Sequence, residues 1–494
     1  MDIFHQLFSQ DKHIQVVLEQ IKAGAADHQL ITGLTGGARP AFLQALYRET
    51  NQPIYLVTSN LLQGQKLVDD LSALLGDEAV HFYPADEFIA SSMTLTSPEL
   101  RSARIATLDR LAQGEKGVYV IPVAALRKMM PTPTNWRAQF LQAEVGDEID
   151  LETWLSHLVK MGYTRSQMVT TPGEFAARGG ILDIYPTYME APIRLELFDT
   201  EVDYIRMFSA DDQRSIEKLQ EVRILPATEI PLSVEERLVI AERIEEALST
   251  SLKKVKNVTT QELLLQHTKQ DIEILREGHL PDHVAKYSSL LFEEPAFLGD
   301  YFAREGLVIF DELGRIQEVM EAWEREEQEW FLSLIEEGKM LHDVKPSYAL
   351  KEVLAMTKQQ KLFFALFART FAGVRFQKTT NFSCKPMQQF HGQIALLQNE
   401  LERWQLEKFT VLFTAYGQER LNTLQTMLAD YEIHTTIGAP SGSGVYLIDA
   451  ALSKGFELPL QKIAVVTDDE LFKQQAKKKK SRPQTMSNAE RIKS

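Results

Sequence analysis

Residues 29–40 read Gln-Leu-Ile-Thr-Gly-Leu-Thr-Gly-Gly-Ala-Arg-Pro and decide the fold of this chain. The stretch joins a short apolar strand, Gln29 to Thr32, through a glycine-rich turn to a helix that we expect from about Pro40 to Thr50. Strands that alternate with helices predict a parallel sheet with crossover helices, an α/β fold. Helical patterns separate this strand from further apolar runs of strand length, at residues 53–58, 80–83 and 117–121.

The same strand, turn and helix form the setting of a Walker A phosphate loop, which reads Gly, four residues, Gly, Lys, then Ser or Thr. Here Gly33 supplies the first glycine, but Ala38, Arg39 and Pro40 replace the second glycine, the lysine and the hydroxyl. The lysine would reach the phosphates, the hydroxyl would hold Mg²⁺, and a proline has no N–H for the phosphate nest. Pro40 suits the first position of a helix. We therefore expect a loop that folds but has lost its nucleotide chemistry.

Asp311 and Glu312 follow a predicted apolar strand and match a Walker B motif with a second acidic residue. In that motif the aspartate orients Mg²⁺ and the glutamate positions water. Without the lysine and the hydroxyl, we predict neither a catalytic residue nor a bound cofactor in this segment. The alternative is a residual ATPase in which Arg39 and the two carboxylates still act.

Length and composition narrow the class of protein. At roughly 150 residues per domain, 494 residues make about three domains, and 44% apolar residues supply their cores. A single cysteine, Cys384, excludes a disulfide framework and a cysteine-based zinc site. We predict no metal site among the 11 histidines. No run of 18 apolar residues and no signal-peptide pattern occur, so we expect a cytoplasmic protein without a membrane span.

The charge is unevenly distributed. The 53 basic and 69 acidic residues give −16, and residues 473–494 hold eight Lys or Arg and one Glu, or +7. The other 472 residues therefore carry −16 − 7 = −23. So acidic a body repels phosphates, which makes protein partners a better expectation than nucleic acid. Lys477 to Lys480 could touch DNA, but a solvated linker is the simpler interpretation.

The pattern changes from about Pro131, where alternating strands at residues 181–186 and 193–198 predict a β-rich insertion. Further on, Trp323, Trp330, Phe331 and Leu334 among glutamates predict an amphipathic helix packed on the core, from about residue 318 to 337. We therefore expect a degenerate P-loop/RecA-like parallel-sheet domain at residues 1–128, an inserted β-rich domain at 129–230, a mostly helical part completing the first domain at 231–380, a second small α/β domain at 381–472 and a basic linker at 473–494.

Three stretches carry a family resemblance: residues 173–186, 194–206 and 213–215. Together they resemble the second domain of the excision-repair protein UvrB and, more closely, the UvrB-like module of the transcription-repair coupling factor family, Mfd. UvrB keeps the Walker A lysine and carries a tyrosine-rich hairpin, whereas the matching stretch here, residues 81–101, has one tyrosine. The sequence after Phe382 also looks like the third domain and linker of that family. The resemblance covers essentially the whole chain and identifies it as an N-terminal region.

The resemblance implies a function. Full-length members recognise RNA polymerase stalled at a DNA lesion, displace it with an ATP-driven double-stranded DNA translocase, and recruit UvrA for nucleotide excision repair. Polymerase, DNA, ATP and Mg²⁺ then belong to C-terminal domains, and no Gly-Lys-Ser/Thr loop occurs here. The implied role of this segment is a UvrA-recruiting scaffold. An independent damaged-DNA binder is a further alternative, which the acidic body disfavours.

The resemblance also implies a binding site. The family binds UvrA through arginines of the insertion, and Arg165 and Arg178 match that pattern. Arginine pairs bidentately with carboxylates and is enriched among residues that dominate interfaces. Ala176 stands where UvrB has an earlier arginine, so the set of contacts departs from that pattern. From spacing alone, the simpler interpretation is that both arginines are ordinary solvated charges.

Overall fold

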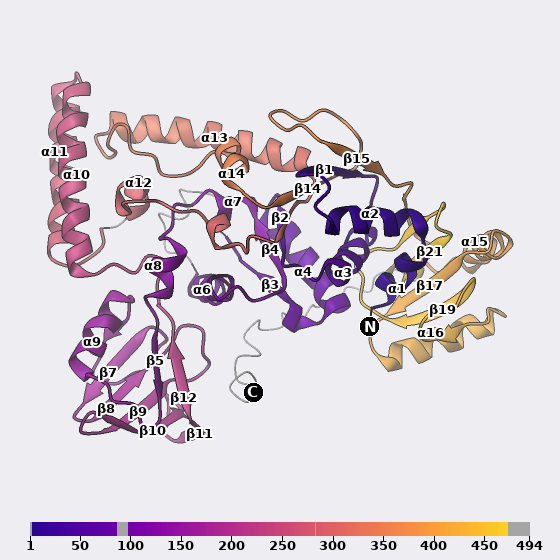
Figure 1. Cartoon of the computed structure of the whole chain (residues 1–494), viewed down its shortest axis with the longest axis horizontal. Coiled ribbons are helices and arrows are strands. Elements are labelled where there is room, and N and C mark those ends of the chain that lie inside the picture. The colour runs from indigo at the N-terminus through magenta and orange to yellow at the C-terminus, as the bar shows by residue number, and fades with distance from the viewer. Residues whose placement is uncertain (1, 86–96, 282, 473–494) are drawn as a thin grey trace.

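The computed structural model describes residues 2–85, 97–281 and 283–472 (Figure 1). Its largest element is a seven-stranded sheet, the main sheet, in the order β15-β1-β14-β13-β2-β4-β3. Every neighbouring pair in it is parallel, so the predicted α/β fold class is confirmed. The strands are β1 His28–Thr32, β2 Ile54–Thr58, β3 Val80–Phe82, β4 Val118–Pro122, β13 Leu307–Phe310, β14 Gln360–Ala365 and β15 Lys378–Asn381.

Helices cover both faces of the main sheet, so both faces are buried. Successive residues of each strand point to opposite sides and therefore enter different cores. Ile54 and Leu56 face one core, and Tyr55 and Val57 face the other. The first core is covered by α1 Ile3–Gln10, α2 Lys12–Lys22, α3 Ala38–Thr50 and α4 Leu61–Leu75. The second is covered by α6 Pro98–Ala112, α7 Val123–Leu126, α8 Pro133–Arg137, α13 Leu313–Glu336 and α14 Leu350–Met356.

Two local expectations need correction here. Helix α3 begins at Ala38, so Pro40 is its third residue and not its first. The first helical turn tolerates proline because its N–H groups have no partner within the helix. Helix α13 begins earlier than predicted and packs on the core only through its first half. Trp323 is buried, whereas Trp330 and Phe331 are half-buried beyond the sheet.

Residues 141–230, the insert, form a separate β-rich layer with its own core. Its main feature is a six-stranded sheet in the order β11-β10-β9-β8-β7-β6, antiparallel except for the pair β6 and β7. Strand β12 pairs with β5, which begins the insert. The elements are β5 Leu141–Glu144, α9 Leu151–Lys160, β6 Thr164–Arg165, β7 Glu174–Arg178, β8 Ile181–Ile184, β9 Ile193–Phe198, β10 Glu201–Phe208, β11 Ser215–Leu219 and β12 Glu221–Ile224.

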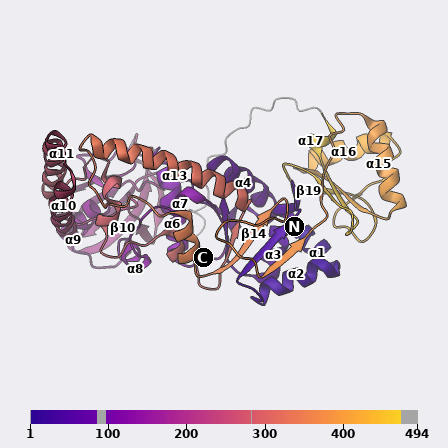
Figure 2. The same ribbon diagram turned by 90° about the horizontal axis from the view of Figure 1, so that it is seen from above.

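Two long helices, α10 Val234–Lys254 and α11 Val258–Arg276, pack on each other at one end of the molecule (Figures 1 and 2). A capping box at Ser233 and Glu236 fixes the start of α10, since each residue satisfies a backbone N–H of the other. Their shared core also takes in the short helix α12 Ser288–Leu291. This hairpin lies at the opposite end from the last part of the chain (Figure 2).

That last part, the C-terminal unit of residues 382–472, is a second α/β layer. Its sheet has the order β16-β20-β21-β17-β19-β18. Helix α15 begins only at Ile394, because His391 and Gly392 have positive φ and break the helical backbone. The elements are β16 Lys385–Pro386, α15 Ile394–Leu406, β17 Thr410–Ala415, α16 Gln418–Asp430, β18 Thr436–Ile437, β19 Gly444–Asp449, β20 Phe456–Leu458, β21 Ile463–Thr467 and α17 Asp468–Leu471.

Candidate partner-binding site

The position of the lost phosphate loop is filled by an ion-pair cluster. The Arg39 guanidinium donates through Nη1 to Asp311 Oδ1 at 2.9 Å, and through Nη2 to Glu312 Oε1. Its Nε donates to the Leu34 carbonyl at 3.0 Å. The carboxylates that would serve magnesium and water in a working site are thus both taken by an arginine of the same chain.

Asp311 is buried and Arg39 is only 13% exposed, which alters the ionisation of both groups. Burial by itself would lower the pKa of Arg39, but the two carboxylates outweigh that effect and raise it above its ordinary value. Burial raises the pKa of Asp311, with Arg39 opposing the rise and Glu312 adding to it. Arginine suits the position because its planar fork contacts two carboxylates at once, which a lysine ammonium does less well.

The insert sheet offers a different kind of surface. Its inner face carries Phe175, Leu182 and Leu195 into the core of the insert. Strand alternation and register therefore place the residues between them on the opposite side, called here the outer face. The outer face comprises Arg178, Ile181, Asp183, Arg194, Glu196, Phe198, Tyr204, Arg206 and Lys218.

Asp183 organises this face. Its side chain is 1% exposed and accepts two hydrogen bonds from Arg194, from Nε at 2.6 Å and from Nη2 at 2.8 Å. These bonds raise the pKa of Arg194, whose guanidinium also lies 4.4 Å from the centre of the Phe208 ring. Arg178 donates to the same carboxylate at 3.3 Å, yet 53% of its side chain is exposed. Arg178 is therefore tethered through one guanidinium nitrogen, while half of its side chain stays open to a partner.

Apolar and basic side chains surround Arg178. Ile181, its neighbour across the β7–β8 hairpin, is 36% exposed, and Phe198 at the end of β9 is 79% exposed. Farther along the face, Arg206 pairs with Glu196 at 2.8 Å, and the Lys218 ammonium lies 4.5 Å from the Tyr204 ring centre. Exposed apolar groups beside charged ones are typical of protein interfaces.

The two arginines predicted from the sequence do not share one row. Arg165 lies in the edge strand β6, level with the core residue Phe175, whereas Arg178 lies three residues farther along β7. Both are exposed, but only Arg178 contacts the Asp183 cluster. Ala176 is opposite Asp183 in register and 2% exposed. An arginine at that position would compete for the carboxylate that Arg194 and Arg178 occupy.

Sequence reasoning missed Asp183, Arg194 and Phe198 as parts of this face. A signal was available for Asp183, which interrupts an apolar run between Leu182 and Ile184. Phe198 gave none, because an aromatic residue at a strand end reads as core until the packing is known.

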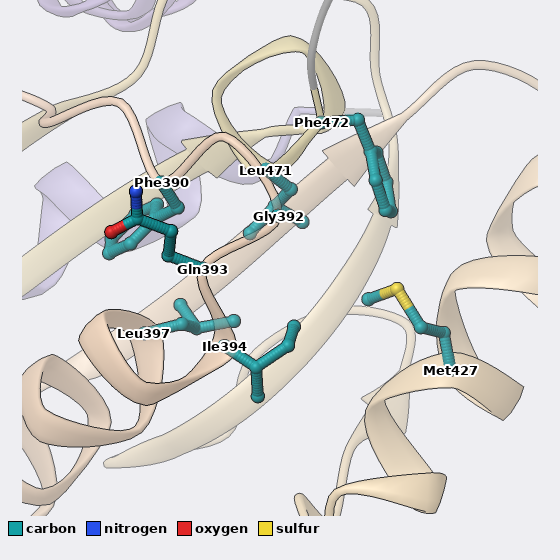
Figure 3. A pocket seen from close by; sticks show the side chains of 8 residues that line it. All are labelled: Phe390, Gly392, Gln393, Ile394, Leu397, Met427, Leu471 and Phe472. Carbon is teal, nitrogen blue, oxygen red and sulfur yellow. The ribbon is translucent and has the colours of Figure 1, made fainter.

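Other features of the described residues offer little chemistry. A cavity of about 10 Å³ lies between α15 and α16 and is lined mostly by apolar side chains, among them Phe390, Leu397 and Met427. Figure 3 shows these side chains. The cavity has room for about one water molecule. Within residues 2–85, 97–281 and 283–472, no group of three or more His, Cys, Asp or Glu could hold a metal ion. No helix in these ranges is both long and apolar enough to span a membrane. Lys477 to Lys480, and residues 86–96 of the stretch compared with the UvrB hairpin, lie outside the described residues.

Comparison with known proteins places these observations in a family context. Residues 141–230 match the family model of the UvrB interaction domain. The whole chain is 43% identical over 498 residues to the transcription-repair-coupling factor of Bacillus subtilis (strain 168), of which it covers 42%. It is 33% identical over 500 residues to the transcription-repair-coupling factor of Staphylococcus aureus (strain bovine RF122 / ET3-1), and again covers 42% of that protein. The chain thus spans less than half the length of these curated relatives, and the resemblance found in the sequence is confirmed.

Proposed function

We propose that this chain is the UvrA-recruiting scaffold of a transcription-repair coupling factor, and that the outer face of the insert sheet is its UvrA-binding surface. The proposal rests on one observation: the family match and the exposed arginine cluster fall on the same part of the chain. The 90 residues that match the UvrB interaction domain, 141–230, are those that form the insert and its partly exposed arginine cluster.

The geometry of Arg178 suits a docking role. Its bond to Asp183 restricts the side chain before binding, so less conformational entropy is lost when a partner carboxylate arrives. Phe198 supplies an exposed ring on the same face, and an aromatic anchor beside an arginine is the combination that dominates many interfaces. A partner with an acidic patch beside an apolar pocket fits this surface.

On this proposal, the segment recruits its partner without ATPase activity of its own. The Arg39 guanidinium engages both Asp311 and Glu312, which supports a nucleotide-silent segment over the residual ATPase. In the longer protein, we propose that C-terminal domains bind the stalled polymerase and double-stranded DNA, and that an ATP-driven motor there releases the polymerase. The chain then couples the stalled complex to nucleotide excision repair by holding UvrA.

An affinity measurement between this chain and purified UvrA tests the proposal. Arg178→Ala should weaken binding by about 2 kcal/mol, or about 30-fold, because a central interface arginine is lost. Arg165→Ala should also weaken binding, but by less, since Arg165 lies at the sheet edge in register with the core residue Phe175, outside the outer face. Circular dichroism should show the fold of both variants intact.

Arg276→Ala is the matched control. Arg276 is 48% exposed and ion-paired with Glu245 at 2.8 Å, much like Arg178 with Asp183, but it lies on α11, outside the insert. Its loss should leave UvrA affinity unchanged. Equal UvrA affinity of the wild type and the double variant Arg165→Ala/Arg178→Ala would contradict the assignment of these arginines. No measurable binding by the wild-type chain would contradict the recruiting function itself.

A further inference from the structure

All three glycines of the degenerate phosphate loop face backbone of the chain's own C-terminal part. A Cβ atom added to Gly33 would lie 1.9 Å from the carbonyl oxygen of Phe382, and one added to Gly37 would lie 2.2 Å from that of Lys454. A Cβ atom on Gly36 would lie 3.0 Å from the carbonyl oxygen of Gly455. Contacts at the two shorter distances do not occur in folded proteins, so the loop admits this backbone only because it lacks side chains.

Gly37 separates packing from backbone conformation. Gly33 and Gly36 have φ of 88° and 52°, which would favour glycine whatever lay nearby. Gly37 has φ −70° and ψ −8°, an ordinary right-handed helical conformation that alanine adopts freely. What requires glycine at position 37 is therefore the carbonyl of Lys454 alone.

Hydrogen bonds also hold the segment around Lys454, both to helix α4 and to the rest of the C-terminal unit. Asp70, buried on α4, accepts from the Ser453 backbone N–H at 2.7 Å and from the Ser453 hydroxyl at 2.8 Å. Glu470 of the C-terminal unit accepts from the N–H of Gly455 at 2.7 Å, which fixes the loop that meets the glycines. Thr35 Oγ1 lies 3.4 Å from Cys384 Sγ across the same boundary.

We propose that the glycine-rich loop, residues 33–37, is the docking site of the C-terminal unit, which binds it through the backbone at Lys454 and Gly455. A phosphate loop needs glycine so that phosphate can approach the backbone; here the same freedom admits peptide carbonyls of the C-terminal unit. The loop thus binds another part of the chain where a phosphate loop binds its ligand. This contact joins the main sheet and the C-terminal unit into one rigid body. This inference is independent of UvrA binding.

A loop that merely survives as a turn would behave differently from a docking site. Alanine at an uncontacted right-handed helical position stabilises a protein, because it restricts the unfolded chain. If Gly37 is contacted only by solvent, Gly37→Ala should leave the C-terminal unit undisturbed. If Lys454 is seated on Gly37, the same change must push the C-terminal unit away from the loop.

Hydrogen exchange on the full chain distinguishes the two. In Gly37→Ala, amides of residues 450–458 and 382–387 should exchange about tenfold faster or more, since opening of the contact becomes easier. The control is Gly114→Ala, at a glycine with φ 68° and nothing within 4 Å of an added Cβ. The control should lower overall stability by backbone strain without faster exchange at the C-terminal unit. Unchanged exchange in Gly37→Ala overturns the proposal.

A second experiment does not depend on perturbing the contact. Thr35→Cys places a thiol beside Cys384, the only native cysteine. With oxidised glutathione as the oxidant, the two thiols should form one disulfide, seen as a mass loss of two hydrogens and protection of both from alkylation. Thr153→Cys, exposed on α9 of the insert, should form no intramolecular disulfide. Failure of Thr35→Cys to crosslink in the folded chain likewise overturns the docking assignment.

Discussion

Arg39 and Arg178 each bind a carboxylate that is almost fully buried, but only Arg39 is itself buried. The Arg39 side chain is 13% exposed beside Asp311 at 3%, whereas Arg178 is 53% exposed beside Asp183 at 1%. A buried cation mainly neutralises its partner, and removing it strands a charge. A half-exposed cation held at one end keeps hydrogen-bonding capacity for another molecule. The same residue type therefore serves stability at one site and recognition at the other.

Arg39→Ala tests the first of these roles. The change removes the cation facing Asp311 and Glu312, and we expect a loss of about 3 kcal/mol in the free energy of unfolding. Urea unfolding monitored by fluorescence would measure it, with Arg276→Ala as an exposed ion-pair control that should change stability by less than about 1 kcal/mol. Micromolar ATP binding by the wild type that Arg39→Ala abolishes would instead favour the residual ATPase.

At the scale of elements, helix α6 attaches the insert to the main sheet. Arg104 contacts Glu229 at 3.0 Å, and Asp109 receives both Nη atoms of Arg223 at 2.6 and 2.7 Å. The hydroxyl of Ser102 donates to the carbonyl of Thr187 at 2.7 Å. Because these contacts lie along one helix, α6 fixes the orientation in which the insert presents its outer face (Figure 1).

The Arg104–Glu229 pair predicts a pH dependence. Burial would raise the pKa of Glu229, but Arg104 and Lys128 outweigh it and hold the pKa below its ordinary value of 4.5. A carboxyl whose pKa is lowered by folding contributes stability above its unfolded pKa, and this contribution is lost as pH falls through the folded pKa. We therefore expect the urea concentration at the unfolding midpoint of the wild type to decrease as the pH is lowered below about 4.5.

Glu229→Gln provides the comparison for that titration. The amide cannot ionise, so the variant should be less stable at pH 7, and its urea midpoint should fall less between pH 5 and pH 3. Equal slopes for the wild type and Glu229→Gln over that range would show that this pair does not contribute to the acid sensitivity.

At the scale of the whole molecule, two sheets share one core and the insert keeps its own. Phe4 of α1 lies in the core shared by the main sheet and the sheet of the C-terminal unit, with its ring centre 6.1 Å from that of Phe456. The same cluster contains Ile31 and Leu56 of the main sheet, and Tyr446 and Val465 of the C-terminal unit. A shared apolar core couples the folding of the parts that contribute to it, since neither can bury its surface alone.

Phe4→Ala should therefore act on both sheets. Loss of a buried phenylalanine costs about 3–5 kcal/mol, and amides of the main sheet and of the C-terminal unit should lose protection together in native-state hydrogen exchange. The insert should keep its protection, because its core contains none of these residues. Phe175→Ala, in the core of the insert, is the reciprocal control. Loss of protection confined to the main sheet in Phe4→Ala would contradict the shared core.

Local signals were sufficient for much of this structure. The runs predicted as strands at 53–58, 117–121 and 193–198 are β2, β4 and β9 within one residue. Such segments repeat one pattern over several residues, and propensity accumulates along them. β14 and β15 were not predicted. A signal for β14 was available, because Leu362 to Ala368 form an unbroken apolar run directly after Lys361.

The parallel α/β layer, the β-rich insert and the loss of the Walker A lysine and hydroxyl can be read from the sequence, because each depends on residues close together in the chain. Three contacts are visible only in the folded chain: Arg39 meets carboxylates about 270 positions away, Lys454 lies against Gly37, and Arg178 shares the Asp183 cluster while Arg165 does not. Contacts between distant segments depend on how whole layers pack, and packing is a property of many residues at once that no short stretch encodes.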